Sequence, residues 1–116
     1  MRFKVPSDPG KILRDRMWDD QNCGCILGYY LHACGVKPKN LCKDFRGIAK
    51  SSDFDLVPKW LVEVDDPDAY SNEYNGRPSK IAEKIMLINM DRDPGWENLL
   101  IELFAKQGDE LIFESS

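Results

Sequence analysis

The stretch CILGYYLHAC, residues 25–34, is the segment around which the rest of the chain is expected to pack. Eight of its ten residues are apolar or aromatic, and at helical spacing they surround the helix instead of forming one stripe. Such a helix belongs inside a fold, and Gly28 within it would let another helix approach closely. Gly35 is a favoured left-handed C-cap, and Asn22 is a candidate N-cap. The sequence therefore predicts a central buried helix at about residues 23–34.

Both ends of the chain carry short strand patterns. Phe3 and Val5 alternate with basic residues, whereas the last apolar stretch has a glutamate at each end. Opposite charges that face each other across an antiparallel pair add a few tenths to about 1 kcal/mol per pair. A two-stranded ribbon alone is marginal and needs helices packed on it. We therefore predict two terminal strands, at about 2–5 and 110–114, that pair antiparallel.

Helical patterns occupy most of the chain between these strands. Ser79 is a clear N-cap, and the isoleucine spacing after it predicts a helix to about Asp91. The cleanest amphipathic spacing begins at Trp96 and ends before Gly108. Weaker patterns predict further short helices at 11–18, 41–49 and near 58–61. The predicted fold is a mainly helical α+β single domain over residues 1–116.

Length and hydropathy restrict the class of protein. At 116 residues the chain is long enough for one hydrophobic core and too short for two. No window approaches the roughly 18 apolar residues that a membrane-spanning helix needs. The basic start at residues 1–6 is not followed by an apolar signal-peptide core. We expect a cytoplasmic protein without a membrane partner, whose four cysteines are reduced thiols.

Charge is distributed unevenly along the chain. Residues 1–50 hold ten Lys and Arg against five Asp and Glu, giving +5, whereas residues 51–116 hold six against fifteen, giving −9. The two halves can complement each other within one fold, or can simply be solvated. Alternatively, a bipolar surface steers a charged partner or orients a homodimer. No basic run is dense enough, or sufficiently interleaved with aromatic residues, to favour nucleic-acid binding.

Five potential metal ligands lie within twenty residues: Cys23, Cys25, His32, Cys34 and Cys42. Zinc requires four sulfur or nitrogen donors in a tetrahedron. The usual two-residue spacer between paired ligands is absent, and a helix would direct its donors to different faces. Buried cysteine commonly serves as a small apolar side chain, which is the main alternative. The pattern favours core thiols and no cofactor, and a zinc site remains the alternative.

Catalytic chemistry finds little support in the sequence. Cys23 or Cys25 at a helix N-terminus would have a lowered pKa, but a cysteine hydrolase also needs a histidine base brought from elsewhere in the fold. The single histidine, His32, is expected on the same helix, where it does not form such a pair. A redox pair of Cys23 and Cys25 has an uncommon one-residue spacer. These patterns indicate a protein that is not an enzyme.

The most loop-like stretch, residues 63–78, carries acidic and aromatic side chains together. Tyrosine is favoured at binding hot spots, and this loop has little else to bury its two tyrosines. The loop would therefore suit a partner with a basic surface. The candidate binding residues are Asp65, Asp66, Asp68, Tyr70, Glu73 and Tyr74.

Several of these segments together resemble small uncharacterised cytoplasmic proteins of bacteria and their phages. The resemblance covers most of the chain and is carried by core and turn residues at 25–28, 33–36, 58–61, 88–91 and 100–108. It implies a prokaryotic or phage setting and brings no catalytic residues. Within that setting, a compact acidic protein is similar in kind to inhibitors that bind and block a host or defence protein.

From the residues and the resemblance we predict a non-enzymatic protein-binding module. Such a module could act as an inhibitor of a host or defence protein, encoded by a phage or another mobile element. The alternative is a small zinc-binding or thiol-redox protein that uses the cysteines from Cys23 to Cys42. A homodimeric accessory protein is a third hypothesis.

Overall fold

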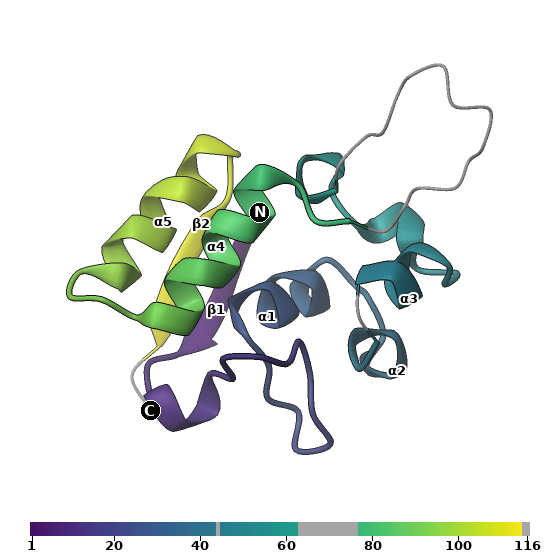
Figure 1. The fold of residues 1–116 in the computed structure, drawn as a ribbon, viewed down its shortest axis with the longest axis horizontal. Coiled ribbons are helices and arrows are strands. Elements are labelled where there is room, and N and C mark those ends of the chain that lie inside the picture. Colours follow the sequence, from purple (N-terminus) through teal and green to yellow (C-terminus); the bar gives the residue numbers. More distant parts are fainter. Residues whose placement is uncertain (44, 63–76, 115–116) are drawn as a thin grey trace.

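Two parallel strands place the beginning and the end of the described chain side by side (Figure 1). The structure is a computed structural model and describes residues 1–43, 45–62 and 77–114. Strand β1 spans Arg2–Pro6 and strand β2 spans Glu110–Glu114. They pair in a two-stranded sheet with Arg2 opposite Glu110 and Pro6 opposite Glu114. Helices α1 to α5 complete a mainly helical α+β fold.

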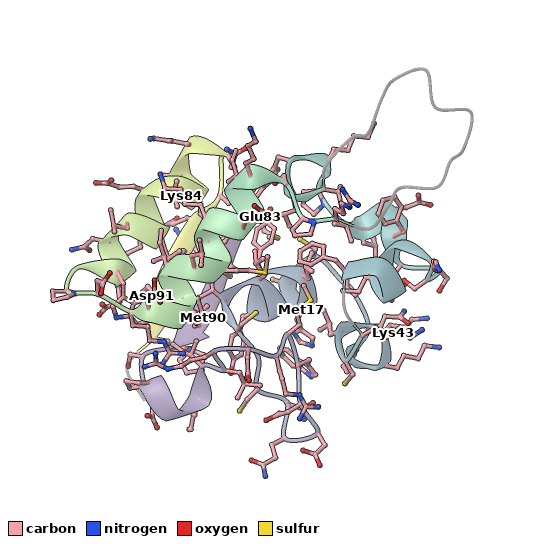
Figure 2. All side chains as sticks on the ribbon, viewed as in Figure 1. Met17, Lys43, Glu83, Lys84, Met90 and Asp91 are labelled. Carbon is pink, nitrogen blue, oxygen red and sulfur yellow. The ribbon has the colours of Figure 1, made fainter. Side chains whose placement is uncertain are left out.

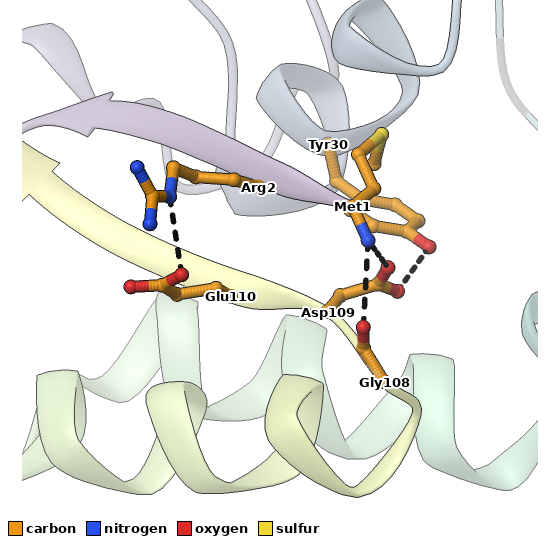
Figure 3. A network of polar contacts seen from close by, with 6 residues as sticks. All are labelled: Met1, Arg2, Tyr30, Gly108, Asp109 and Glu110. Carbon is orange, nitrogen blue, oxygen red and sulfur yellow. Dashed lines mark hydrogen bonds and ion pairs between the residues drawn. The ribbon is translucent and has the colours of Figure 1, made fainter.

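The predicted positions of both strands are confirmed, but their antiparallel pairing is wrong. Parallel pairing needs a long crossover, which the chain between the strands supplies. The charge pairing that suggested antiparallel strands forms equally well in parallel register. Arg2 Nε donates to Glu110 Oε2 at 3.1 Å (Figure 3). Lys4 Nζ lies 3.6 Å from Glu114 Oε1. Charge complementarity therefore does not determine strand direction.

The sheet has one buried and one solvated face. Phe3, Val5 and Leu111 are buried, and Phe3 makes edge-to-face contacts with Tyr30 of α1 and Phe104 of α5. On the other face, the two ion pairs are exposed to solvent, and Ile112 between the two glutamates is half-buried. This alternation is the pattern of a sheet whose single apolar face is covered by helices.

The central helix, α1, spans Ile26–Ala33 and is buried on most sides, as its composition predicts. It begins three residues after the predicted start. Its N-cap is Cys25, whose side chain makes no capping hydrogen bond, so the expected cap at Asn22 is wrong. Asn22 instead has a left-handed backbone with φ 59°. The predicted left-handed conformation of Gly35 is confirmed by its φ of 102°.

Two longer helices lie side by side next to the sheet (Figure 1). Helix α4 spans Lys80–Asp91 and α5 spans Trp96–Lys106. The hydroxyl oxygen of Ser79 accepts a hydrogen bond from Ala82 N at 3.1 Å, which confirms the predicted N-cap of α4. Within the described ranges, no helix is long and apolar enough to cross a membrane.

Short elements connect these helices. The helix predicted at residues 11–18 is wrong, and the only helical element there is a 3-10 turn at Pro9–Lys11. The backbone groups of the residues after this turn form hydrogen bonds with the residues just before α1. Leu13 N donates to Gly24 O at 2.9 Å, and Cys25 N donates to Arg16 O at 3.1 Å. The single helix predicted at 41–49 is wrong, because one short helix ends at Leu41 and another begins at Phe45. The remaining short elements are α2 at Pro38–Leu41, α3 at Phe45–Ala49, and 3-10 turns at Phe54–Leu56 and Lys59–Leu61.

Asp109 joins the start of the chain, the turn before β2 and the central helix (Figure 3). The α-amino group of Met1 donates to Asp109 Oδ1 at 3.1 Å and to the carbonyl of Gly108 at 3.4 Å. The Tyr30 hydroxyl donates to Asp109 Oδ2 at 2.6 Å. Burial and this hydrogen bond raise the pKa of Tyr30 above its ordinary value, so the hydroxyl remains a donor. The contact is structural, because it fastens β2 to α1.

Candidate binding pocket

Asn89 of α4 forms hydrogen bonds that hold the segment before α1 against the core. It is 1% exposed, its Nδ2 donates to Leu13 O at 2.9 Å, and its Oδ1 accepts from Ile26 N at 3.3 Å. One amide therefore satisfies both the first turn of α1 and the segment that precedes it. Arg92 adds hydrogen bonds from its guanidinium to the carbonyls of Pro9 and Ile12. These contacts determine where residues 13–18 run.

Two glycines allow this segment to lie directly against the start of α1. A Cβ on Gly28 would lie 1.7 Å from the carbonyl oxygen of Met17, and a Cβ on Gly24 would lie 2.0 Å from the same atom. Gly28 therefore permits the close approach of an irregular segment. Our prediction that it admits another helix is wrong. Because the contact involves backbone, a larger residue cannot be accommodated by rotation of a side chain.

Trp18, the next residue, is held against α1 by aromatic contacts. Its ring is stacked on His32 at a centroid distance of 4.8 Å and an interplanar angle of 15°, and it meets Tyr29 edge to face at 5.4 Å. The side chain is only 3% exposed. Its indole Nε1 is buried and has no hydrogen-bond partner among the residues that the structure describes. Buried donors are almost always satisfied, so this N–H is exceptional.

Trp18 lines a surface pocket of about 310 Å³, which we call the Trp18 pocket. Its apolar wall comes from three parts of the chain: Met17 and Trp18 before α1, Phe45 of α3, and Met86 of α4. In the view of Figure 2, Met17 lies between Met90 of α4 and Lys43. The described residues of the lining are Asp15, Arg16, Met17, Trp18, Cys42, Lys43, Phe45 and Met86.

Two of the three charged residues described in the lining of the Trp18 pocket are basic. These are Arg16 and Lys43, and both are exposed, as is Asp15, the acidic residue in the described part of the lining. None of the ion pairs between described residues involves either of these two cations. An apolar pocket with cations at its edge suits a ligand that is apolar and negatively charged.

The open face of the sheet is a weaker candidate. Its charged side chains pair with one another across β1 and β2, leaving no unbalanced charge for a partner. Charged residues along a short edge strand are also the usual protection against unwanted strand pairing. This face is therefore adapted to water.

A second pocket of about 310 Å³ lies along one continuous segment, residues 54–59 together with Val62. It holds one acidic and one basic side chain, Asp55 and Lys59, and both are exposed. No buried unpaired polar atom is found among its lining residues. Among the described pockets, the Trp18 pocket thus has the more distinctive chemistry.

The five predicted metal ligands are in different environments. Cys25 is buried, Cys23 and Cys34 are partly buried, Cys42 is exposed at the Trp18 pocket, and the exposed His32 stacks on Trp18. In the described part of the chain, no three Cys, His, Asp or Glu side chains are grouped so that they could hold one metal ion. The zinc alternative therefore receives no geometric support here.

Two of the thiols are poorly suited to nucleophilic chemistry. Burial raises the pKa of Cys25, although it stands at the N-terminus of α1, where a lowered pKa was expected. Burial, reinforced by the Asp109 carboxylate, raises the pKa of Cys34 to about 11. Because these pKa values are raised, both thiols are mainly protonated at neutral pH. Since the thiolate is the reactive form of cysteine, both are unreactive under these conditions. Cys25 lies in the core and Cys34 packs against it, as the prediction of core thiols expects, but the same prediction is wrong for Cys42, which is exposed.

The six candidate residues of the acidic loop, Asp65 to Tyr74, lie outside the described residues.

The Trp18 pocket was not predicted from the sequence. Its lining comes from separate segments, so no local spacing reveals it. The available signals were Gly24 and Gly28, four residues apart, and the Met17–Trp18 pair that precedes them.

Comparison with known proteins gives no assignment: no protein-family model, curated protein or solved structure matches the chain.

Proposed function

We propose that this protein is a non-enzymatic binding module whose Trp18 pocket holds a segment of an acidic partner protein. The observation that carries the proposal is the combination of an apolar aromatic and thioether wall with two cations at its rim. Arg16 and Lys43 are exposed and make no ion pair with a described residue, so both can meet the charges of a partner.

The residue types support a protein partner. Trp, Met and Arg are enriched in protein interfaces, and a few such residues usually contribute most of the binding energy. Methionine is unbranched and adapts to differently shaped side chains. Met17 and Met86 line the pocket, and Met90, one turn beyond Met86 on α4, is 44% exposed. This thioether surface extends the area available to a bound segment.

The sequence prediction and this proposal both give a non-enzymatic protein-binding module. They differ in the surface that binds the partner. The acidic loop was expected to bind a basic partner, whereas the Trp18 pocket favours an acidic one. An inhibitor of a host or defence protein, as the resemblance implies, would be one module of this kind. Its target would present an acidic segment that contains an apolar residue.

Selection from a random peptide display library tests the proposal and requires no purified partner. The folded protein, immobilised through a tag, is expected to enrich peptides that combine Asp or Glu with Leu, Met or Phe. Free peptide of the enriched sequence should compete with the displayed peptides. Enrichment of basic peptides, or no enrichment above that of an empty surface, contradicts the proposal.

A further inference from the structure

We infer that the partner inserts a large apolar side chain into the Trp18 pocket and that a neighbouring carboxylate accepts a hydrogen bond from Trp18 Nε1. The inference rests on the proposed function and specifies the occupant. Its starting point is the indole N–H of Trp18, which is buried and has no acceptor within residues 1–43, 45–62 and 77–114. Burial removes the water that would otherwise accept this hydrogen bond, and nothing in the described part of the chain replaces it.

Three other contacts position the ring. One face is stacked on His32, and Tyr29 meets the ring edge to face. The Cε3 edge lies against Gly24, where a Cβ would come within 2.7 Å. Nε1 is on the opposite long edge of the indole. This N–H is a buried polar atom with no hydrogen-bond partner among the described residues.

The surroundings of Trp18 select the acceptor. Arg16 and Lys43 line the same pocket and outnumber the acidic Asp15 among its described residues, so a negatively charged acceptor is favoured over a neutral one. Phe45, Met17 and Met86 provide the apolar surface for the side chain beside it. Because Nε1 is buried before binding, the occupant must displace side chains, and methionine side chains rearrange readily.

Nuclear magnetic resonance of the ¹⁵N-labelled wild-type protein tests this inference. The three tryptophans give three indole N–H resonances, which through-bond experiments assign without a variant. The probe is a blocked synthetic peptide, acetyl-Glu-Asp-Leu-Asp-Glu-amide, with two controls: serine in place of leucine, and lysine in place of every acidic residue. We expect the leucine peptide to shift the indole proton of Trp18 downfield, as a hydrogen-bonded N–H requires, with smaller changes at Trp60 and Trp96.

The control peptides should leave the Trp18 indole unchanged at the same concentration. If the leucine peptide perturbs the backbone amides of Arg16 and Lys43 but not the Trp18 indole, the hydrogen bond to the occupant is contradicted while the proposed function stands. If leucine, methionine and phenylalanine versions of the peptide perturb none of these groups, both proposals are contradicted.

Discussion

The carbonyl oxygen of Met17 lies in the space that a side chain on Gly28 would need, 1.7 Å from where the Cβ would be. This contact places the segment that carries Trp18 directly on the first turns of α1. Gly28 is therefore required for packing, although it stands in a helix, where glycine is unfavourable by about 1 kcal/mol relative to alanine. The position of the Trp18 pocket depends on this approach.

Replacing Gly28 with alanine should destabilise the protein. Helix propensity alone would favour alanine, but the added methyl group meets backbone, and overpacking of this kind costs about 1–3 kcal/mol. Urea unfolding followed by circular dichroism measures the change. Gly10→Ala is the control, because position 10 is exposed and a Cβ there meets only the Asp8 side chain. A Gly28→Ala protein as stable as wild type would show that the contact with Met17 is wrong.

Replacing Asn89 with alanine should lower the free energy of unfolding by about 2–3 kcal/mol. The change leaves the buried Ile26 N–H and the Leu13 carbonyl without their partner, and each unsatisfied buried group costs about 1–3 kcal/mol. Asn98→Ala on the exposed face of α5 is the matched control and should change stability by less than about 0.5 kcal/mol. Equal effects of the two substitutions would contradict the role of Asn89.

Asp53 should make the stability depend on pH in the acid range. Its Oδ2 accepts hydrogen bonds from Lys37 N at 2.9 Å and Asn40 Nδ2 at 2.8 Å, and these bonds lower the pKa of its carboxyl group. A group whose pKa is lower in the folded protein stabilises it above the unfolded value, about 3.9 for aspartate. That stabilisation is lost as the pH falls through the folded pKa.

Urea unfolding of wild type and Asp53→Asn across the acid range measures this effect. The stability difference between them should be largest above about pH 4 and should shrink as the pH falls below that value. A difference that stays constant with pH would show that the Asp53 carboxylate does not depend on these two donors.

The cysteines should differ in alkylation by iodoacetamide at neutral pH. Cys42 is exposed and should react first in the folded protein, whereas the buried Cys25, with its raised pKa, should react only on unfolding. Mass spectrometry of proteolytic peptides measures the order, and protein unfolded in urea serves as the control in which the difference disappears. Rapid labelling of Cys25 in the folded state would contradict its burial.

Local chemistry made several parts of the fold predictable. Ser79 caps α4 because its hydroxyl satisfies a free N–H, and Gly35 ends α1 because its backbone is left-handed. Both features depend on neighbours within a few residues. The α1 composition likewise predicted a buried helix.

Long-range contacts account for the wrong predictions. Residues 11–18 have a loose helical spacing, but their backbone groups pair with residues 23–25, which also delay the start of α1. The direction of β1 relative to β2 is determined by the path of the whole chain between them, which no charge pattern encodes. The Trp18 pocket was missed for the same reason, since its wall combines Met17, Phe45 and Met86 from separate elements.

Titration calorimetry of the selected acidic peptide against two charge-reversal variants tests the binding role of the Trp18 pocket most directly. We predict that Arg16→Glu combined with Lys43→Glu weakens binding by about tenfold or more, equivalent to about 1.4 kcal/mol. Lys50→Glu combined with Lys84→Glu changes the net charge equally at exposed sites outside the pocket lining and should leave the affinity nearly unchanged. Equal weakening by both pairs would mean that only net charge matters, which would contradict a binding site at Trp18.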